Sequence, residues 1–154
     1  MQKVRLITVG KIKISWVQEG LDEYKKRISR FVDLEIVELS PSKEKDPSKQ
    51  SCEETERLLK SLRDDEFVVA LDETGKNLNT EDFAKILSDQ NDIGKPVTFV
   101  IGGAYGFDDR VKERADMCMC LGSLTLPHEL VRIVFLEGLY RALDLSRGGS
   151  YHHK

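Results

Sequence analysis

Three stretches of this sequence have the composition of ligand-binding loops, because each follows a short apolar run and offers small residues or exposed main chain. They are residues 71–75, 102–106 and 121–127, with the sequences LDETG, GGAYG and LGSLTLP. In open α/β sheets, ligands bind beyond the carboxyl ends of the strands, and loops that leave strands in this way can converge. We therefore expect the three stretches to form one ligand pocket.

The glycine cluster at residues 102–106 suits close approach of the main chain to a bound molecule, because glycine lacks a Cβ and tolerates positive φ. Its spacing excludes two common nucleotide sites. GGAYG has neither the lysine nor the hydroxyl of the phosphate loop GxxxxGK[ST], and GGxxG does not match the dinucleotide fingerprint GxGxxG. Without further evidence, an ordinary turn remains the alternative interpretation.

Sulfur ligands are a second kind of chemistry to consider. Cys118 and Cys120 alternate with Met117 and Met119 in an apparent strand. A soft-metal site needs a second pair of ligands, and this stretch has none. The pattern favours buried packing of the sulfur atoms, and we predict no metal.

Composition limits the class of protein. The chain has 154 residues and a formal net charge of −3, which predicts one domain over residues 1–154 without the broad basic excess of a protein that grips nucleic acid through phosphates alone. No apolar run is long enough for a membrane span or a signal peptide, and the cysteine count is odd. These features predict a cytoplasmic protein in a reducing compartment with no membrane partner.

Strands and helices are expected to alternate along the chain, which predicts an α/β fold with a mostly parallel sheet flanked by helices. Apolar runs predict strands at residues 4–9, 34–39, 67–71, 97–101 and 117–121, with 34–39 resembling an edge strand. Helical spacing predicts helices at 15–31, 52–62, 80–87 and 108–114, and a polar, mobile loop at 41–51.

A long helix is expected to begin near Pro127, since proline suits the first helical position. Its residues are apolar on nearly every side, apart from a stripe with His128 and Arg132 and another with Glu137 and Arg141. One domain of this size can hardly cover such a helix. We therefore predict a homodimer through this helix, with Phe135 as an interface residue.

Four motifs are shared, in the same order and spacing, with the RlmH family, bacterial enzymes that methylate large-subunit ribosomal RNA. They are VIGGAYGF, LGSLTLPHELVR, LYRA near the end of the long helix, and the terminal YHHK. The sequence resembles this family over its whole length. The resemblance implies the fold of the SPOUT class of methyltransferases, in which the C-terminal segment forms a trefoil knot, a feature that periodicity alone never suggests.

The resemblance also implies the ligand, S-adenosylmethionine. An adenine ring needs an apolar slot edged by main-chain hydrogen-bonding groups, which the three loops can supply. By resemblance, the cofactor-binding residues are Leu71, Gly102, Gly103, Leu121, Gly122, Ser123, Leu124, Thr125 and Leu126.

The implied reaction is methyl transfer to N3 of a pseudouridine in a stem-loop of 23S ribosomal RNA, in the assembled ribosome. N3 must lose its proton, and a nearby cation would stabilise the anion. The family's RA and YH motifs imply catalytic roles for Arg141, Tyr151 and His152 on the substrate side. The cationic side chains proposed to contact RNA are His128, Arg132 and His153.

Plainer roles remain open for these residues. His128 is a candidate for helix capping or simple exposure, and Arg141 for an ion pair with Glu137. The plain interpretation of a polar C-terminal tail is a frayed terminus. The functional interpretation is an arm, made flexible by Gly148 and Gly149, that closes on substrate. The alternative function is a non-catalytic ribosome-associated or RNA-binding module with the same fold.

Overall fold

The computed structural model describes residues 1–153, so the terminal Lys154 of the YHHK motif lies outside the described residues. A five-stranded sheet has the order β2-β1-β4-β3-β5, and every pair of neighbouring strands is parallel. The elements in chain order are β1 (Lys3–Val9), α1 (Ser15–Ile28), β2 (Asp33–Leu39), α2 (Pro47–Ser61), β3 (Phe67–Asn77), α3 (Thr80–Asp92), β4 (Val97–Val100), α4 (Asp109–Arg114), β5 (Met117–Cys120) and α5 (Leu130–Ser146). The predicted parallel α/β sheet is confirmed, with β2 at an edge.

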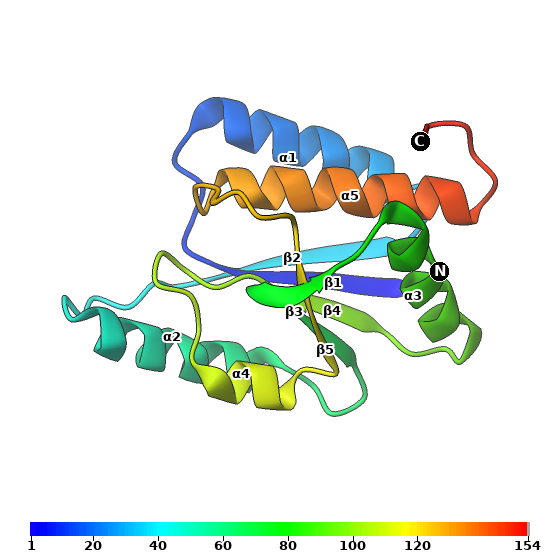
Figure 1. Cartoon of the computed structure of the whole chain (residues 1–154). Coiled ribbons are helices and arrows are strands. Elements are labelled where there is room, and N and C mark those ends of the chain that lie inside the picture. The colour runs from blue at the N-terminus through cyan, green and yellow to red at the C-terminus, as the bar shows by residue number, and fades with distance from the viewer. Residues whose placement is uncertain (154) are drawn as a thin grey trace.

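Helices cover both faces of the sheet (Figure 1). On one face, α1, α3 and α5 pack side chains such as Leu21, Phe83 and Leu136 into the larger core. On the other face, α2 and α4 contribute Leu58 and Val111 to a smaller core. Because helices cover both faces, every residue of β1 from Val4 to Val9 and every residue of β4 is buried.

Strand β3 runs further than the predicted residues 67–71. Its register against β5 shifts between Leu71 and Lys76, both of which pair with Met119. The intervening polar residues therefore leave the ladder as a bulge before the strand resumes. Gly75 lies so close to β5 that an added Cβ would sit 2.6 Å from the main-chain nitrogen of Met119, so only glycine fits.

Helix α2 begins at Pro47, earlier than the predicted start at residue 52, and part of the predicted mobile loop is helical. The carboxylate of Asp46 accepts a hydrogen bond from the main-chain N–H of Lys49 at 2.9 Å, and Pro47 takes the first helical turn. This N-cap and proline are a standard helix start that the polar composition concealed.

Helix α5 begins at Leu130, three residues after the predicted start, because residues 128–129 form a turn. Phe135 is fully buried within the chain, where it packs against Phe83 and Phe99, so its prediction as an interface residue is wrong. Over residues 1–153, none of the helices is long and apolar enough to cross a membrane.

Candidate functional site

A cleft with two lobes opens at the carboxyl ends of β3, β4 and β5. The two lobes share six lining residues, which makes them parts of one site: Leu71, Asp72, Glu73, Ile101, Leu126 and Val131. The three predicted ligand loops thus converge, as the strand-end rule requires.

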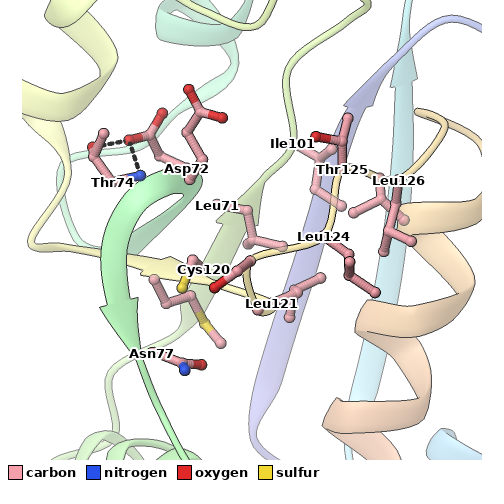
Figure 2. A pocket seen from close by; sticks show the side chains of 15 residues that line it. Leu71, Asp72, Thr74, Asn77, Ile101, Cys120, Leu121, Leu124, Thr125 and Leu126 are labelled. Atoms are coloured by element: carbon pink, nitrogen blue, oxygen red, sulfur yellow. Dashed lines mark hydrogen bonds between the residues drawn. The ribbon is translucent and has the colours of Figure 1, made fainter.

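The first lobe has a volume of about 580 Å³ and is bounded by the loop between β5 and α5. In Figure 2, Leu71, Ile101, Leu121, Leu124 and Leu126 are grouped around it, with the bulge of β3 opposite. The loop residues 121–126 all line this lobe and leave main chain exposed beside apolar side chains.

The second lobe, of about 710 Å³, is bounded by the glycine loop. Gly102 and Gly103 line it, and Gly106 folds back so that its N–H donates to the carbonyl of Gly103 at 3.0 Å. Of these glycines only Gly106 has a positive φ, at 70°. Position 102 requires glycine for a different reason: an added Cβ would lie 2.8 Å from the carbonyl carbon of Gly106.

The residues of the cleft fit the expected cofactor. A site for a molecule of that size is usually an apolar cavity of about 300–1,000 Å³ with a few placed polar groups. All nine residues predicted to bind S-adenosylmethionine line one or both lobes. Gly102 is part of a main-chain cradle that any larger side chain would fill.

Asp72 and Glu73, on the bulge of β3, also line the cleft; they belong to the predicted loop 71–75 but were not singled out as binding residues. Burial raises the pKa of Asp72, but hydrogen bonds from the main chain and hydroxyl of Thr74 and from Lys112 outweigh it and hold the pKa below its ordinary value. Asp72 is therefore a carboxylate at neutral pH. The signal in the sequence was its place directly after an apolar strand.

The C-terminal tail is docked on α5, which contradicts the predicted flexible arm. Gly148 has a φ of 74°, and its N–H donates to the carbonyl of Leu145, while the N–H of Gly149 donates to the carbonyl of Asp144. This pattern is a Schellman motif, which ends a helix and turns the chain back along it. The N–H of Tyr151 then donates to the Asp144 carboxylate at 3.0 Å.

Glu137 holds the tail and Arg141 together. One carboxylate oxygen accepts from the hydroxyls of Tyr24 at 2.8 Å and Tyr151 at 2.9 Å, and the other accepts from Arg141 at 2.7 Å. The Arg141 guanidinium also lies over the Tyr151 ring, 4.6 Å from its centroid. The predicted Glu137–Arg141 ion pair is confirmed, and the predicted catalytic pair Arg141 and Tyr151 lies in one cluster.

Docking of the tail is expected to depend on pH through Glu137. Burial raises its pKa, but the hydrogen bonds from Tyr24, Arg141 and Tyr151 hold it below the ordinary value. A carboxyl with a depressed pKa stabilises the folded arrangement above its unfolded pKa of about 4.3, and this contribution is lost as pH falls through the lower folded pKa. Nuclear magnetic resonance of the Tyr151 ring should therefore show a docked tail at neutral pH and a detached tail once the pH falls below the lowered pKa of Glu137. A Tyr151 signal that stays constant throughout the acid titration would contradict this.

The other predicted catalytic and RNA-binding residues do not lie in one place. His128 is exposed and lines the second lobe. Arg132 is only 2% exposed and donates to the carbonyl of Val9 at 2.8 Å, so the structure contradicts its prediction as an RNA contact. The side chain of His152 is 12% exposed, with its Nε2 3.5 Å from a carboxylate oxygen of Glu81, and His153 is exposed.

Of the two cysteines of β5, Cys118 packs against the smaller core, whereas Cys120 lines the first lobe of the cleft. Both are free, and burial raises the pKa of the Cys118 thiol. Within residues 1–153, no group of three or more His, Cys, Asp or Glu side chains is arranged to hold a metal ion.

The chain is similar in sequence to known methyltransferases over nearly its whole length. A family model described as "Predicted SPOUT methyltransferase" matches residues 2–152. A protein of Streptococcus gordonii named ribosomal RNA large subunit methyltransferase H is 43% identical over 159 aligned positions, covering 97% of this chain and 99% of that protein. Its namesake in Streptococcus equi subsp. zooepidemicus is 42% identical, again covering 97% of this chain and 99% of that protein.

Among solved structures, the crystal structure of a probable methyltransferase from Bordetella pertussis Tohama I superposes with a TM-score of 0.61. Its sequence identity is 12%, and the match covers 92% of this chain and 95% of that one. At this identity the likeness concerns the fold, and it agrees with a parallel sheet flanked by helices.

Proposed function

Since this chain belongs to the SPOUT methyltransferase family, and within it to the ribosomal RNA large subunit methyltransferase H proteins, we propose that it methylates 23S ribosomal RNA. The methyl donor is S-adenosylmethionine, and the acceptor is N3 of a pseudouridine in a large-subunit stem-loop of the assembled ribosome. Residues 1–154 act as one domain with a C-terminal trefoil knot, in the cytoplasm.

The observation that carries this proposal is the convergence of Leu71, the glycine loop and residues 121–126 on one cleft. Bound there, S-adenosylmethionine supplies an electrophilic methyl group. The leucines would hold the adenine, the main chain of the loops would supply hydrogen-bonding groups, and the apolar walls would exclude water from the reacting atoms. Methyl transfer breaks an S–C bond, forms an N–C bond and releases the N3 proton.

The substrate side of the reaction requires a second subunit. Arg141, Tyr151 and His152 line neither lobe of the cleft. Arg141 lies in the C-terminal half of α5, and Tyr151 docks on that helix through Asp144 and Glu137, whereas residues 121–126 precede the helix. A homodimer in which the tail of one subunit approaches the cleft of its partner would bring them together. Arg141 would then stabilise negative charge on the base, and the Tyr151 ring could stack on an unpaired base.

Exposed apolar side chains beside the cleft support the homodimer. Trp16 on α1 is 60% exposed, Leu124 in the loop before α5 is 86% exposed, and Ile14 is 38% exposed. The start of α1 and the turn before α5 are joined, because the main-chain N–H groups of Lys13 and Ile14 donate to Glu129. Apolar groups gathered in this way are typical of an interface.

The homodimer prediction is tested at Val134, which helix periodicity places on the side of α5 that faces away from the sheet. We expect the wild-type protein to be a dimer by size-exclusion chromatography with light scattering. Val134→Glu should yield a folded monomer, because an unpaired charge is costly to bury at an interface. A wild-type monomer at micromolar concentration would contradict the dimer, and a variant that stays dimeric would contradict an interface through Val134.

The function itself is tested by mass spectrometry of 23S ribosomal RNA from cells with and without this protein. Loss of one methyl group from a pseudouridine in the deletion strain, restored by the purified protein with S-adenosylmethionine and ribosomes, would support the enzyme. The alternative, a non-catalytic RNA-binding module, predicts that the methylation pattern stays the same in both strains.

A further inference from the structure

Behind the glycine loop lies a buried acid that the cleft does not contain. Glu54 on α2 is 1% exposed, and its Oε2 accepts a hydrogen bond from the main-chain N–H of Ser42 at 2.9 Å. Its other oxygen, Oε1, is buried and has no hydrogen-bond partner among the described residues. No Lys, Arg or His within residues 1–153 forms an ion pair with it.

The unpartnered oxygen faces the ligand loop at close range. A Cβ added to Gly103 would lie 2.5 Å from Glu54 Oε1, so the carboxylate packs directly against this glycine. Gly103 itself lines the second lobe of the cleft. Glu54 is therefore separated from the cleft only by the thickness of the loop.

The neighbouring residue on α2 holds the far end of the same loop. The hydroxyl oxygen of Thr55 accepts a hydrogen bond at 2.9 Å from the N–H of Asp108, the residue that caps α4. In Figure 1, the segment between β4 and α4 runs down beside α2. Adjacent side chains of α2 thus contact both ends of the glycine loop.

A buried carboxylate oxygen without a donor is costly, and in native proteins each such group calls for an explanation. We propose that Glu54 is a positioning residue for the methyl-donor site, and that Oε1 accepts a main-chain N–H of residues 103–104 when the loop closes on S-adenosylmethionine. The inference rests on the proposed function, because it assumes that this cleft binds that cofactor. Glu54 acts through the loop and touches neither cofactor nor RNA.

Glu54→Gln provides the test, because it keeps the shape of the side chain. The Ser42 N–H requires an oxygen at the Oε2 position, so the glutamine must direct its NH2 group toward Gly103. The acceptor is then replaced by a donor. We expect calorimetry to show about tenfold weaker binding of S-adenosylhomocysteine, the loss of roughly one charge-assisted hydrogen bond.

Stability separates positioning from a merely structural role. Because the substitution removes an unpaired buried charge, the melting temperature of the free Glu54→Gln protein should equal or exceed that of the wild type. A structural role predicts the opposite pattern, a lower melting temperature with unchanged cofactor affinity. That pattern would overturn the inference.

Glu66→Gln is the matched control. Glu66 is also 1% exposed, but its oxygens are satisfied by Arg5 at 2.5 Å and by the N–H of Arg63 at 3.0 Å, far from the loop. This variant should lose stability and keep its cofactor affinity. If the wild-type protein bound no S-adenosylhomocysteine, the proposed function itself would be contradicted. This result differs from the one that would contradict the role of Glu54 alone.

Hydrogen exchange on the wild type tests the same idea without a substitution. Addition of S-adenosylhomocysteine should slow exchange of a main-chain amide at residues 103–104, and Glu54→Gln should abolish that protection. Amides at these positions that exchange equally fast with and without the bound molecule would refute loop closure onto Glu54.

Discussion

Replacement of Gly102 by alanine will strongly weaken the binding of S-adenosylmethionine. The added Cβ would lie 2.8 Å from the carbonyl carbon and 2.9 Å from the Cα of Gly106. Both contacts are main chain, so the loop itself must move. Overpacking of this kind costs about 1–3 kcal/mol, which corresponds to roughly 5- to 150-fold in affinity.

Gly138→Ala is the control for this substitution. An alanine Cβ there would meet only Phe83, at an ordinary 3.9 Å, and glycine-to-alanine exchange within a helix is usually stabilising. Titration calorimetry should therefore give a dissociation constant roughly 5- to 150-fold higher for Gly102→Ala and a wild-type value for Gly138→Ala. Unaltered affinity in Gly102→Ala would mean that GGAYG is an ordinary turn and that the cofactor binds elsewhere.

Removal of Arg141 will separate catalysis from cofactor binding. Arg141 lies in the C-terminal half of α5 and lines neither lobe of the cleft in its own subunit, so Arg141→Ala should leave the affinity for S-adenosylmethionine unchanged. If its charge stabilises the deprotonated base in the partner's site, single-turnover methyl transfer to ribosomes should fall by about 10²–10³-fold. Deletion of residues 150–154 should have a similar effect, since it removes Tyr151 and His152.

Arg57→Ala controls for loss of a helical ion pair. Arg57 pairs with Glu53 at 2.6 Å with the same spacing as Arg141 and Glu137, but it lies on α2 on the opposite face of the sheet. Its methyl transfer rate should remain that of the wild type.

Full activity of the tail deletion would reject the role of the tail, and a parallel loss of cofactor affinity would place the tail in the cofactor pocket instead.

Local signals in the sequence were sufficient for much of the cleft. Apolar runs marked β3 and β4, and the resemblance selected Leu71, Gly102 and residues 121–126, which do come together. The extension of β3 was not predictable in the same way. Its residues DETGKN are polar and only become a strand because the chain pairs with β5 beyond the bulge, an interaction between distant segments.

Long-range contacts also explain the wrong predictions. Helical spacing placed Arg132 on a polar stripe of an isolated helix, where it would be exposed. In the folded chain it is buried, because it binds Val9 of β1 and Glu38 of β2. Gly148 and Gly149 predicted a flexible arm on composition alone. Their role in a helix-ending motif depends on the Asp144 carboxylate and on Tyr151 reaching Glu137, which no local pattern reveals.

The strand order β2-β1-β4-β3-β5 has a consequence for how the protein folds. Val4 in the first strand pairs with Val97, so β1 keeps one unpaired side until most of the chain has been synthesised. Chains grow at about 5–20 residues per second, and parallel pairings between distant segments form slowly. The nascent chain therefore exposes an apolar strand edge for several seconds. We expect refolding in vitro to be slow and to aggregate increasingly as protein concentration rises.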